Sequence, residues 1–147
     1  MTDRLAAVTI LLVEDSPTDA ELTRKALTRE RPGARIVDAR DGVEALAYLR
    51  KEPGYEESPE PDLILLDLNM PRMDGRELLR IVKNDSRLRQ IPVVVLTTSS
   101  EAEDIRSAYS AGSNAYVVKP HDLKRFFEVI HDMDHFWFDV AMRPSGA

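Results

Sequence analysis

The sequence contains no cysteine, which excludes disulfide frameworks, thiolate metal sites, iron–sulfur clusters and a cysteine nucleophile. It also lacks a long apolar run. The apolar stretch at residues 8–13 leads directly into Glu14 and Asp15, whereas a membrane-spanning helix needs about 20 apolar residues. No cleavage pattern of a secretory signal is present. We therefore expect a cytoplasmic protein that does not enter a membrane.

Basic residues are fewer than acidic ones: the sequence has 20 Lys and Arg and 26 Asp and Glu, which gives a formal net charge of −6. Because duplex-binding proteins usually present a basic face, we do not expect a nucleic acid partner. Glycine and proline together account for 15 of 147 residues, far fewer than in a low-complexity segment, so the composition is that of a folded domain. Its length predicts a single domain over residues 1–147, with a core at about 8–138 and a tail at 139–147 that is expected to fray after Val140.

What the sequence does contain is a regular alternation of short apolar runs and helical patterns. Five runs are predicted as strands: residues 8–13, 35–39, 63–66, 92–96 and 115–118. The first, third and fourth are apolar without alternation, as expected for strands buried on both faces of a parallel sheet. Helical crossovers between parallel strands place helices on both faces. We predict an α/β, flavodoxin-like (βα)5 fold, doubly wound, with strand order 2-1-3-4-5.

Capping patterns mark where the helices begin. Ser16 precedes a proline and Asp41 is followed three residues later by Glu44, which are typical helix N-termini. Ser100 with Glu103 predicts the start of the fourth helix, and Gly112 its end. The predicted helices cover about residues 17–31, 42–50, 75–84, 101–111 and 122–138. A polar, proline-rich loop separates the second helix from the third strand at residues 51–61.

Polar residues stand at the carboxyl ends of four of the five strands. Glu14 and Asp15 follow the first strand, Asp67 follows the third, and Thr97 and Lys119 follow the fourth and fifth. Ligands of open parallel sheets bind beyond these ends, near the point where strand order reverses. Because the four strands are neighbours in the predicted order, these five side chains are expected to converge on one crevice.

Three carboxylates in one crevice repel one another by about 4 kcal/mol per pair at 4 Å and an effective dielectric near 20. They must therefore take up protons or bind a cation. Oxygen ligands of this kind suit Mg²⁺. Asp67 could then attack phosphorus to form an acyl phosphate, while Lys119 and Thr97 would supply an ammonium and a hydroxyl to the transferring oxygens.

Taken together, these motifs resemble the receiver domain of two-component response regulators. The resemblance is carried by four segments in order: Glu14-Asp15, DLNMPRMDG from Asp67, LTT around Thr97, and YVVKP from Tyr116 to Pro120. It extends from about residue 8 to 133. Within the family, DLNMPRMDGRE, IPVVVLTTSS and the aromatic HFWF are similar to stand-alone regulators paired with bacterial phytochrome histidine kinases.

The resemblance implies a role for each site residue. Asp67 would accept a phosphoryl group from a sensor kinase and later lose it by self-dephosphorylation. Asp15 and Asp67, with the backbone carbonyl of Asn69, would bind Mg²⁺, and Glu14 would act mainly through water. Asn69, Thr98 and Lys119 would surround the phosphate. Such a protein is a phosphoacceptor in signalling rather than an enzyme in the ordinary sense.

The resemblance also implies a conformational switch. Thr97 would turn its hydroxyl toward the phosphate and Tyr116 would move into the vacated space. The surface of the fourth helix, fifth strand and fifth helix would change with them. Lys119-Pro120 would be a cis peptide. Thr98 stands where the family usually has a smaller residue, and Asn69 and Ser99 are variable positions that tune self-dephosphorylation.

Two features near the carboxyl end have competing interpretations. Five of the nine aromatic residues lie in the last predicted helix, and Phe136, Trp137 and Phe138 are candidates for a homodimer or partner surface. Only 28 residues follow Lys119, so the output is expected to be a protein contact rather than an attached DNA-binding domain. His131 and His135 have the spacing of a metal pair, but a solvated helix face is the stronger interpretation.

Three other functions fit the sequence less well. A phosphohydrolase using an aspartyl intermediate usually needs a second Asp two residues after the nucleophile, and that position is Asn69, which cannot donate a proton in the same way. A flavin site is disfavoured because the acidic EDSPTD segment would repel the flavin phosphate. A degenerate receiver that only dimerises conflicts with the five site positions, all of which are intact.

Overall fold

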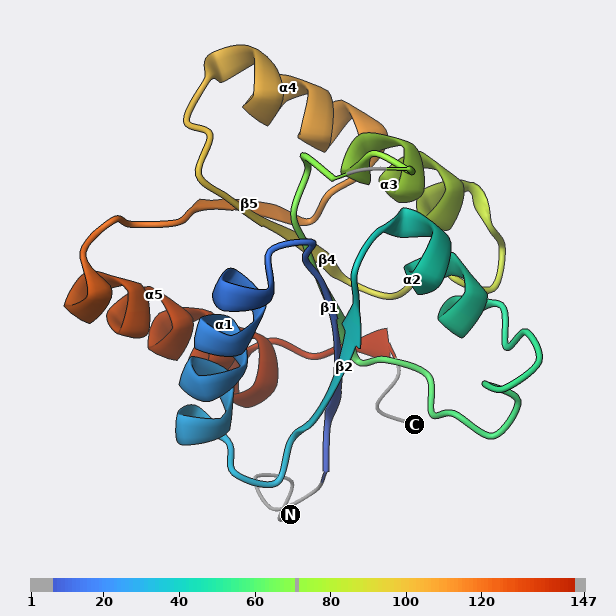
Figure 1. Ribbon diagram of the computed structural model, residues 1–147, viewed down its shortest axis with the longest axis horizontal. Coiled ribbons are helices and arrows are strands. Elements are labelled where there is room, and N and C mark those ends of the chain that lie inside the picture. The colour runs from blue at the N-terminus through green and yellow to red at the C-terminus, as the bar shows by residue number, and fades with distance from the viewer. Residues whose placement is uncertain (1–6, 71, 145–147) are drawn as a thin grey trace.

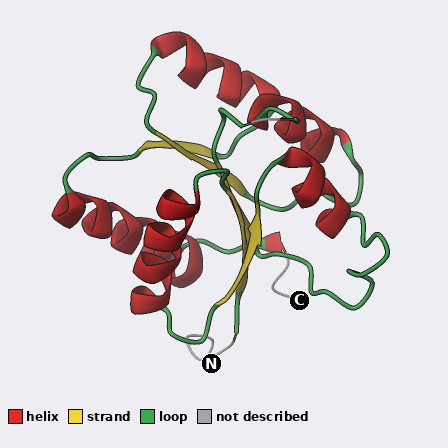
Figure 2. Ribbon diagram, in the orientation of Figure 1, coloured by secondary structure: helices red, strands yellow, loops and turns green. Residues whose placement is uncertain are grey.

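The computed structural model describes residues 7–70 and 72–144 and forms one five-stranded parallel sheet with helices on both faces (Figures 1 and 2). The strands are β1 (Thr9–Val13), β2 (Arg35–Ala39), β3 (Leu63–Leu66), β4 (Val93–Thr97) and β5 (Ala115–Val118). Their order is β2-β1-β3-β4-β5 and every neighbouring pair is parallel. The predicted (βα)5 fold and strand order are confirmed.

The helices alternate with the strands along the chain: α1 (Pro17–Glu30), α2 (Gly42–Leu49), α3 (Gly75–Asn84), α4 (Ala102–Ala111) and α5 (Leu123–His135). Most begin where the capping patterns predict. The Ser16 hydroxyl accepts a hydrogen bond from the backbone N–H of Asp19, at 3.2 Å, and Asp41 caps α2 in the same way. Gly112, with φ of 111°, ends α4 in the left-handed conformation that glycine adopts without steric cost.

One predicted cap is wrong. Helix α4 begins at Ala102 with Glu101 as its N-cap, and no side chain caps it. Ser100 therefore belongs to the preceding loop. The reason is local: the Ser99 hydroxyl accepts a hydrogen bond from the backbone N–H of Glu101, at 3.2 Å, and also donates to Asp104. These bonds keep the chain in a loop up to Glu101.

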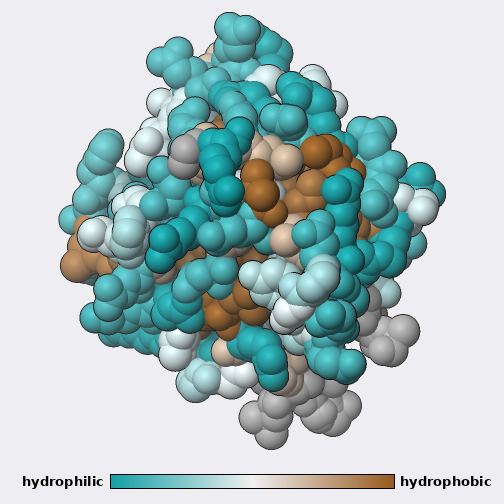
Figure 3. Space-filling model, turned by 45° about the vertical axis from the view of Figure 1, so that its right-hand side comes forward, coloured by the Kyte–Doolittle hydropathy of each residue, from teal (hydrophilic) through white to brown (hydrophobic). Residues whose placement is uncertain are grey.

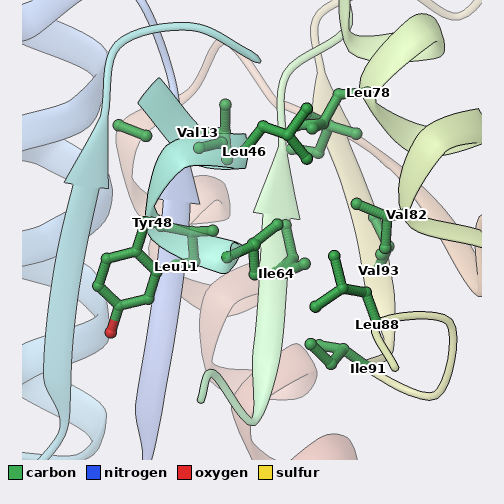
Figure 4. Packing of buried hydrophobic residues seen from close by; sticks show 14 of the residues in the cluster. Leu11, Val13, Leu46, Tyr48, Ile64, Leu78, Val82, Leu88, Ile91 and Val93 are labelled. Atoms are coloured by element: carbon green, nitrogen blue, oxygen red, sulfur yellow. The ribbon is translucent and has the colours of Figure 1, made fainter. Parts of the chain in front are cut away.

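Successive residues of each central strand point to opposite faces of the sheet, so hydrophobic clusters form on both faces. Leu11 and Val13 of β1 face α2 and α3, where they meet residues such as Leu46 and Leu78 (Figure 4). Ile10 and Leu12 of β1 point to the opposite face of the sheet. There they pack with residues of α1 and α5, namely Ala26, Leu27, Phe126, Ile130 and Met133. Burial on both faces explains why these strands carry unbroken apolar sequences.

The last predicted helix is shorter than expected. Helix α5 ends at His135, and residues Phe136–Val140 form a π-helical segment, η2. The described residues after it, up to residue 144, also contact the rest of the domain. Arg143 forms an ion pair with Asp62 at 3.2 Å, donates to the carbonyl of Trp137 and lies over the ring of Phe138.

The loop between α2 and β3 has no helix or strand but is anchored to α2. The hydroxyl of Tyr48 donates to the carbonyl of Pro59 at 2.7 Å, and the rings of Tyr48 and Tyr55 meet edge to face at 5.5 Å. On the face shown in Figure 3, hydrophilic residues cover most of the surface and hydrophobic ones appear in small patches. No helix of the described residues has the length and apolar character needed to cross a membrane.

Candidate functional site

The sheet brings the polar strand ends together as the sequence predicts. Strand β1 pairs with β3, β3 with β4 and β4 with β5, each in parallel register. Backbone hydrogen bonds fix the residues that follow the strands: the N–H of Asp67 donates to Val13 at 3.0 Å, and the N–H of Lys119 donates to Thr97 at 2.7 Å. The side chains beyond these bonds are therefore positioned by the core and not by flexible loops.

Three carboxylates form the centre of the site. Glu14, Asp15 and Asp67 each offer an oxygen, and these oxygens all lie within 4.8 Å of one another. Glu14 is buried, Asp67 is half-buried and Asp15 is exposed. Burial raises the pKa of Asp67, with the Asp15 charge acting in the same direction. The cluster thus has the oxygen ligands and the excess negative charge that suit a hard divalent cation such as Mg²⁺.

Lys119 lies beside this cluster. The sequence predicts that it contacts the phosphoryl oxygens, and in this structure its ammonium contacts Glu14. Its Nζ donates to Glu14 Oε1 at 2.6 Å and to Asp19 Oδ2 at 3.4 Å. Burial works against the charged ammonium, yet the hydrogen bond to Glu14 prevails and raises the pKa of Lys119. Glu14 therefore contacts the lysine directly, in addition to any role through water. The structure holds a charged lysine ready beside Asp67.

Asp19 is a contact that sequence reasoning missed. Its sequence position indicated only an acidic residue in the first turn of α1, and it does occupy that place. Its carboxylate also reaches Lys119, which is 100 residues away in the chain. No local pattern predicts such a contact. It depends on α1 and the segment after β5 meeting at the same end of the sheet.

Thr97 of β4 and Tyr116 of β5 lie on the same face of the sheet, since Val95 and Thr97 pair in register with Tyr116 and Val118. Thr97 is 1% exposed at the end of β4, whereas Thr98 and Asn69 are exposed. Tyr116 packs against Leu68, Val95 and Ala108, and its hydroxyl donates to the carbonyl of Ser99 at 2.9 Å. The tyrosine ring is already turned toward the core in this structure.

The peptide bond before Pro120 differs from the expectation. The described residues contain no cis peptide bond, so Lys119-Pro120 is trans, which is the lower-energy isomer for most X-Pro bonds.

The other candidate residues lie away from this centre. Phe136 is 49% exposed, while Trp137 and Phe138 are partly buried against the cluster formed by α1, α5 and the sheet. Arg31 and Arg143 both lie over the ring of Phe138. The aromatic side chains therefore serve the fold at least as much as the surface, and only Phe136 stays largely accessible.

His131 and His135 stack in parallel with ring centroids 6.4 Å apart, and both side chains are 61% exposed. Within the described residues, the potential metal-ligand cluster is the carboxylate group of Glu14, Asp15 and Asp67, and it does not include these histidines.

Comparison with known proteins identifies the family. The model of the response regulator receiver domain matches residues 10–131. The chain belongs to this family. The receiver is 41% identical over 137 residues to response regulator Rcp1 of Synechocystis, covering 93% of each chain.

Solved structures of related proteins agree. The phosphorylated cyanobacterial phytochrome response regulator RcpA is similar with a TM-score of 0.91 and 44% identity, covering 95% of this receiver and 100% of RcpA. The Mn²⁺-bound form of Rcp1 is similar with a TM-score of 0.87 and 40% identity, covering 94% and 99%. These relatives include phytochrome response regulators, as the sequence motifs predict.

Proposed function

We propose that this receiver accepts a phosphoryl group on Asp67 and thereby acts as a switch in two-component signalling. The observation that carries the proposal is the convergence of three carboxylate oxygens within 4.8 Å beside the buried Lys119 and Thr97. A structural acid cluster would not need an ammonium and a hydroxyl at the same strand ends. The phosphorylated relative RcpA and the Mn²⁺-bound Rcp1 support this interpretation.

The chemistry follows from the residues in place. A carboxylate oxygen of Asp67 attacks phosphorus, and the bond from phosphorus to the donor's imidazole nitrogen breaks, leaving its electron pair on the nitrogen. Lys119 moves from Glu14 toward the transferring oxygens, and Thr97 donates its hydroxyl to one of them. Mg²⁺, bound by Asp15, Asp67 and the Asn69 carbonyl, would neutralise the phosphoryl oxygens. Self-dephosphorylation is the attack of water on phosphorus, which returns the Asp67 carboxylate and releases phosphate.

The donor is proposed to be a histidine kinase of the phytochrome type, because relatives named as phytochrome response regulators are 42–44% identical over most of the chain. The output is proposed to be contact with a protein partner or a second copy through the surface of α4, β5 and α5. Phosphotransfer from a panel of purified phosphorylated kinases tests the first point. Light scattering with and without beryllofluoride, which takes the place of the phosphoryl group on Asp67, tests whether two copies associate. An unchanged mass would contradict a phosphorylation-driven dimer.

The central experiment is incubation with acetyl phosphate and Mg²⁺, followed by intact-protein mass spectrometry. The wild-type protein is expected to gain the mass of one phosphoryl group, and Asp67→Asn to gain none. Asp132→Asn is the matched control, since it removes the same charge from an exposed position on α5. Equal labelling of Asp67→Asn would contradict the proposal, and multiple turnover of a small phosphoester would favour a phosphohydrolase instead.

Metal binding is tested separately by thermal unfolding. At a Mg²⁺ concentration about 100 times its Kd, the unfolding free energy of the wild type should rise by about 2.7 kcal/mol. Asp67→Asn should show a clearly smaller rise because one ligand oxygen has lost its charge. An equal rise in the two proteins would place the metal elsewhere.

A further inference from the structure

A chain of polar contacts lies on the outer side of the loop that connects β4 to α4. The hydroxyl of Ser99 donates to Asp104 Oδ2 at 2.5 Å. The other oxygen of Asp104 accepts from Arg76 Nη2 at 2.6 Å. Arg76 also donates through Nε to the hydroxyl of Ser107, at 3.3 Å. Three elements are joined in this way: the loop, the first turn of α4 and the start of α3.

These contacts are stronger than ordinary surface pairs. The side chains of Arg76 and Asp104 are only 21% and 27% exposed, and hydrogen bonds with ionised partners are about twice as strong as neutral ones. The Ser99 hydroxyl and the Arg76 guanidinium both hold the pKa of Asp104 below its usual value. Asp104 thus remains an ionised acceptor for both partners at neutral pH.

Ser99 connects this chain of contacts to the phosphorylation site. It lies two residues after Thr97, whose hydroxyl must reach the phosphoryl group on Asp67. Its backbone carbonyl accepts the hydrogen bond from the Tyr116 hydroxyl, at 2.9 Å. The same residue is therefore held from two sides, by Tyr116 through its backbone and by Asp104 through its side chain.

We propose that Asp104 is a positioning residue for phosphorylation, which holds the Thr97–Ser99 loop and the Tyr116 ring in the arrangement competent to stabilise the phosphoryl group. Arg76 fixes the orientation of the Asp104 carboxylate from α3. The inference rests on the proposed phosphorylation of Asp67 and adds a residue outside the five that define the site.

The expected effect follows from a population argument. When only a fraction of molecules hold the competent loop arrangement, the apparent rate of phosphorylation falls by that fraction. Loss of a partly buried charge-assisted hydrogen bond reduces such a population by about fivefold. Asp104→Ala is therefore expected to slow labelling by acetyl phosphate about fivefold without abolishing it. The Mg²⁺ affinity should stay unchanged because Asp104 is not among the clustered carboxylates.

A matched control is available one residue away. Glu103 lies in the same first turn of α4 and carries the same charge, but its side chain is exposed and makes no hydrogen bond or ion pair within the described part of the chain. Glu103→Ala should label at the wild-type rate. Ser99→Ala and Asp104→Ala should be non-additive when combined, because each removes the same contact. Equal slowing by Glu103→Ala, or an unchanged rate in Asp104→Ala, would overturn the proposal.

A second readout does not depend on phosphorylation. With fluorotyrosine incorporated, the ¹⁹F resonance of Tyr116, assigned by Tyr116→Phe, should shift in unphosphorylated Asp104→Ala and not in Glu103→Ala. A merely stabilising role for Asp104 would leave this resonance in place, and that result would overturn the proposal. If the wild type itself fails to label while the resonance shifts, the phosphorylation function fails and the positional link from Asp104 to Tyr116 stands.

Discussion

Gly75 packs directly against the backbone that carries the proposed phosphoryl acceptor, Asp67. A Cβ atom at this position would lie 2.4 Å from the carbonyl oxygen of Asp67 and 2.7 Å from the Cα of Leu68. Both are backbone atoms, which cannot rotate away as a side chain would. The N–H of Gly75 also donates to the carbonyl of Leu68 at 2.9 Å. Glycine is required here because the chain turns back against its own backbone.

Gly75→Ala should therefore lower the free energy of unfolding by about 1–3 kcal/mol, the usual cost of overpacking. It should also slow phosphorylation, because the backbone that carries Asp67 must move. Urea denaturation and acetyl phosphate labelling measure the two effects. Gly33→Ala is the control: a Cβ there meets nothing within 4 Å, so its stability should be equal or higher by up to about 1 kcal/mol. A Gly75→Ala variant as stable as wild type would contradict this account.

At this scale the sequence predicts the five strand-end residues but not their partners. Glu14, Asp67 and Lys119 are predictable because each directly follows an apolar strand, and parallel strands end at the same edge. The contacts of Lys119 with Asp19 and of Arg76 with Asp104 cannot be predicted from the sequence, because they depend on how separate helices pack. Side chains this long can reach several partners, and only the folded arrangement selects among them.

At the scale of elements, α1 and α5 lie side by side on one face of the sheet (Figure 1). An exposed pair adds to their hydrophobic contact: His131 Nδ1 lies 2.7 Å from Glu30 Oε1. The hydrogen bond and charge of Glu30 raise the pKa of His131. Protonated histidine thus links the two helices more strongly than the neutral ring does.

Because the folded-state pKa of His131 is raised, its contribution to stability is fully present below the unfolded value of about 6.5. It is lost as pH rises through the folded-state pKa. His131→Gln should therefore lower the melting temperature at about pH 5.5 and have little effect at about pH 8.5, as measured by thermal unfolding followed by circular dichroism. His121→Gln, at an exposed position without a hydrogen bond or ion pair in the described residues, should show no such difference. Equal behaviour of the two variants would refute the link.

The elements themselves are largely predictable, and the misses have local causes. Helix α3 has its predicted bounds because Asp74 caps it and one face is apolar. The start of α4 is missed because Ser99 and not Ser100 carries the local hydrogen bonds. The end of α5 is missed because the apolar pattern continues through Phe138, although the backbone changes to a π-helical turn at Phe136. Hydrophobic spacing alone does not distinguish these two helix types.

At the scale of the whole molecule, the phosphoryl-acceptor site and a buried ion network occupy opposite ends. Arg31, just after α1, pairs with Asp134 at 3.1 Å and with Asp139 at 3.1 Å. The side chains of Arg31 and Asp134 are only 9% and 5% exposed. The network fastens α5 and η2 to α1 where the strands begin, whereas the site lies where they end.

Asp134→Asn should lower the free energy of unfolding by about 3 kcal/mol, because removing one partner leaves the other charge buried and poorly compensated. The rate of Asp67 phosphorylation in the folded protein should be unchanged, since the network lies at the other end of the sheet. Denaturation and acetyl phosphate labelling below the unfolding transition measure both. Asp132→Asn, on the exposed side of the same helix, should leave both quantities unchanged. A slower labelling rate in Asp134→Asn would show that the two ends are coupled.

The single tryptophan of the sequence lies at the end of the molecule with the ion network, away from the phosphoryl-acceptor site. Trp137 sits in η2, beyond the 13 residues of α5, so it lies about 20 Å along the helix from the end near Lys119. Its ring meets Phe136 edge to face and its carbonyl is held by Arg143. Intrinsic fluorescence excited at the red edge of the tryptophan band therefore reports the detachment of the carboxyl-terminal segment. Titration of Mg²⁺ into the protein should therefore leave the tryptophan emission unchanged while the metal binds at Glu14, Asp15 and Asp67, at the other end of the sheet.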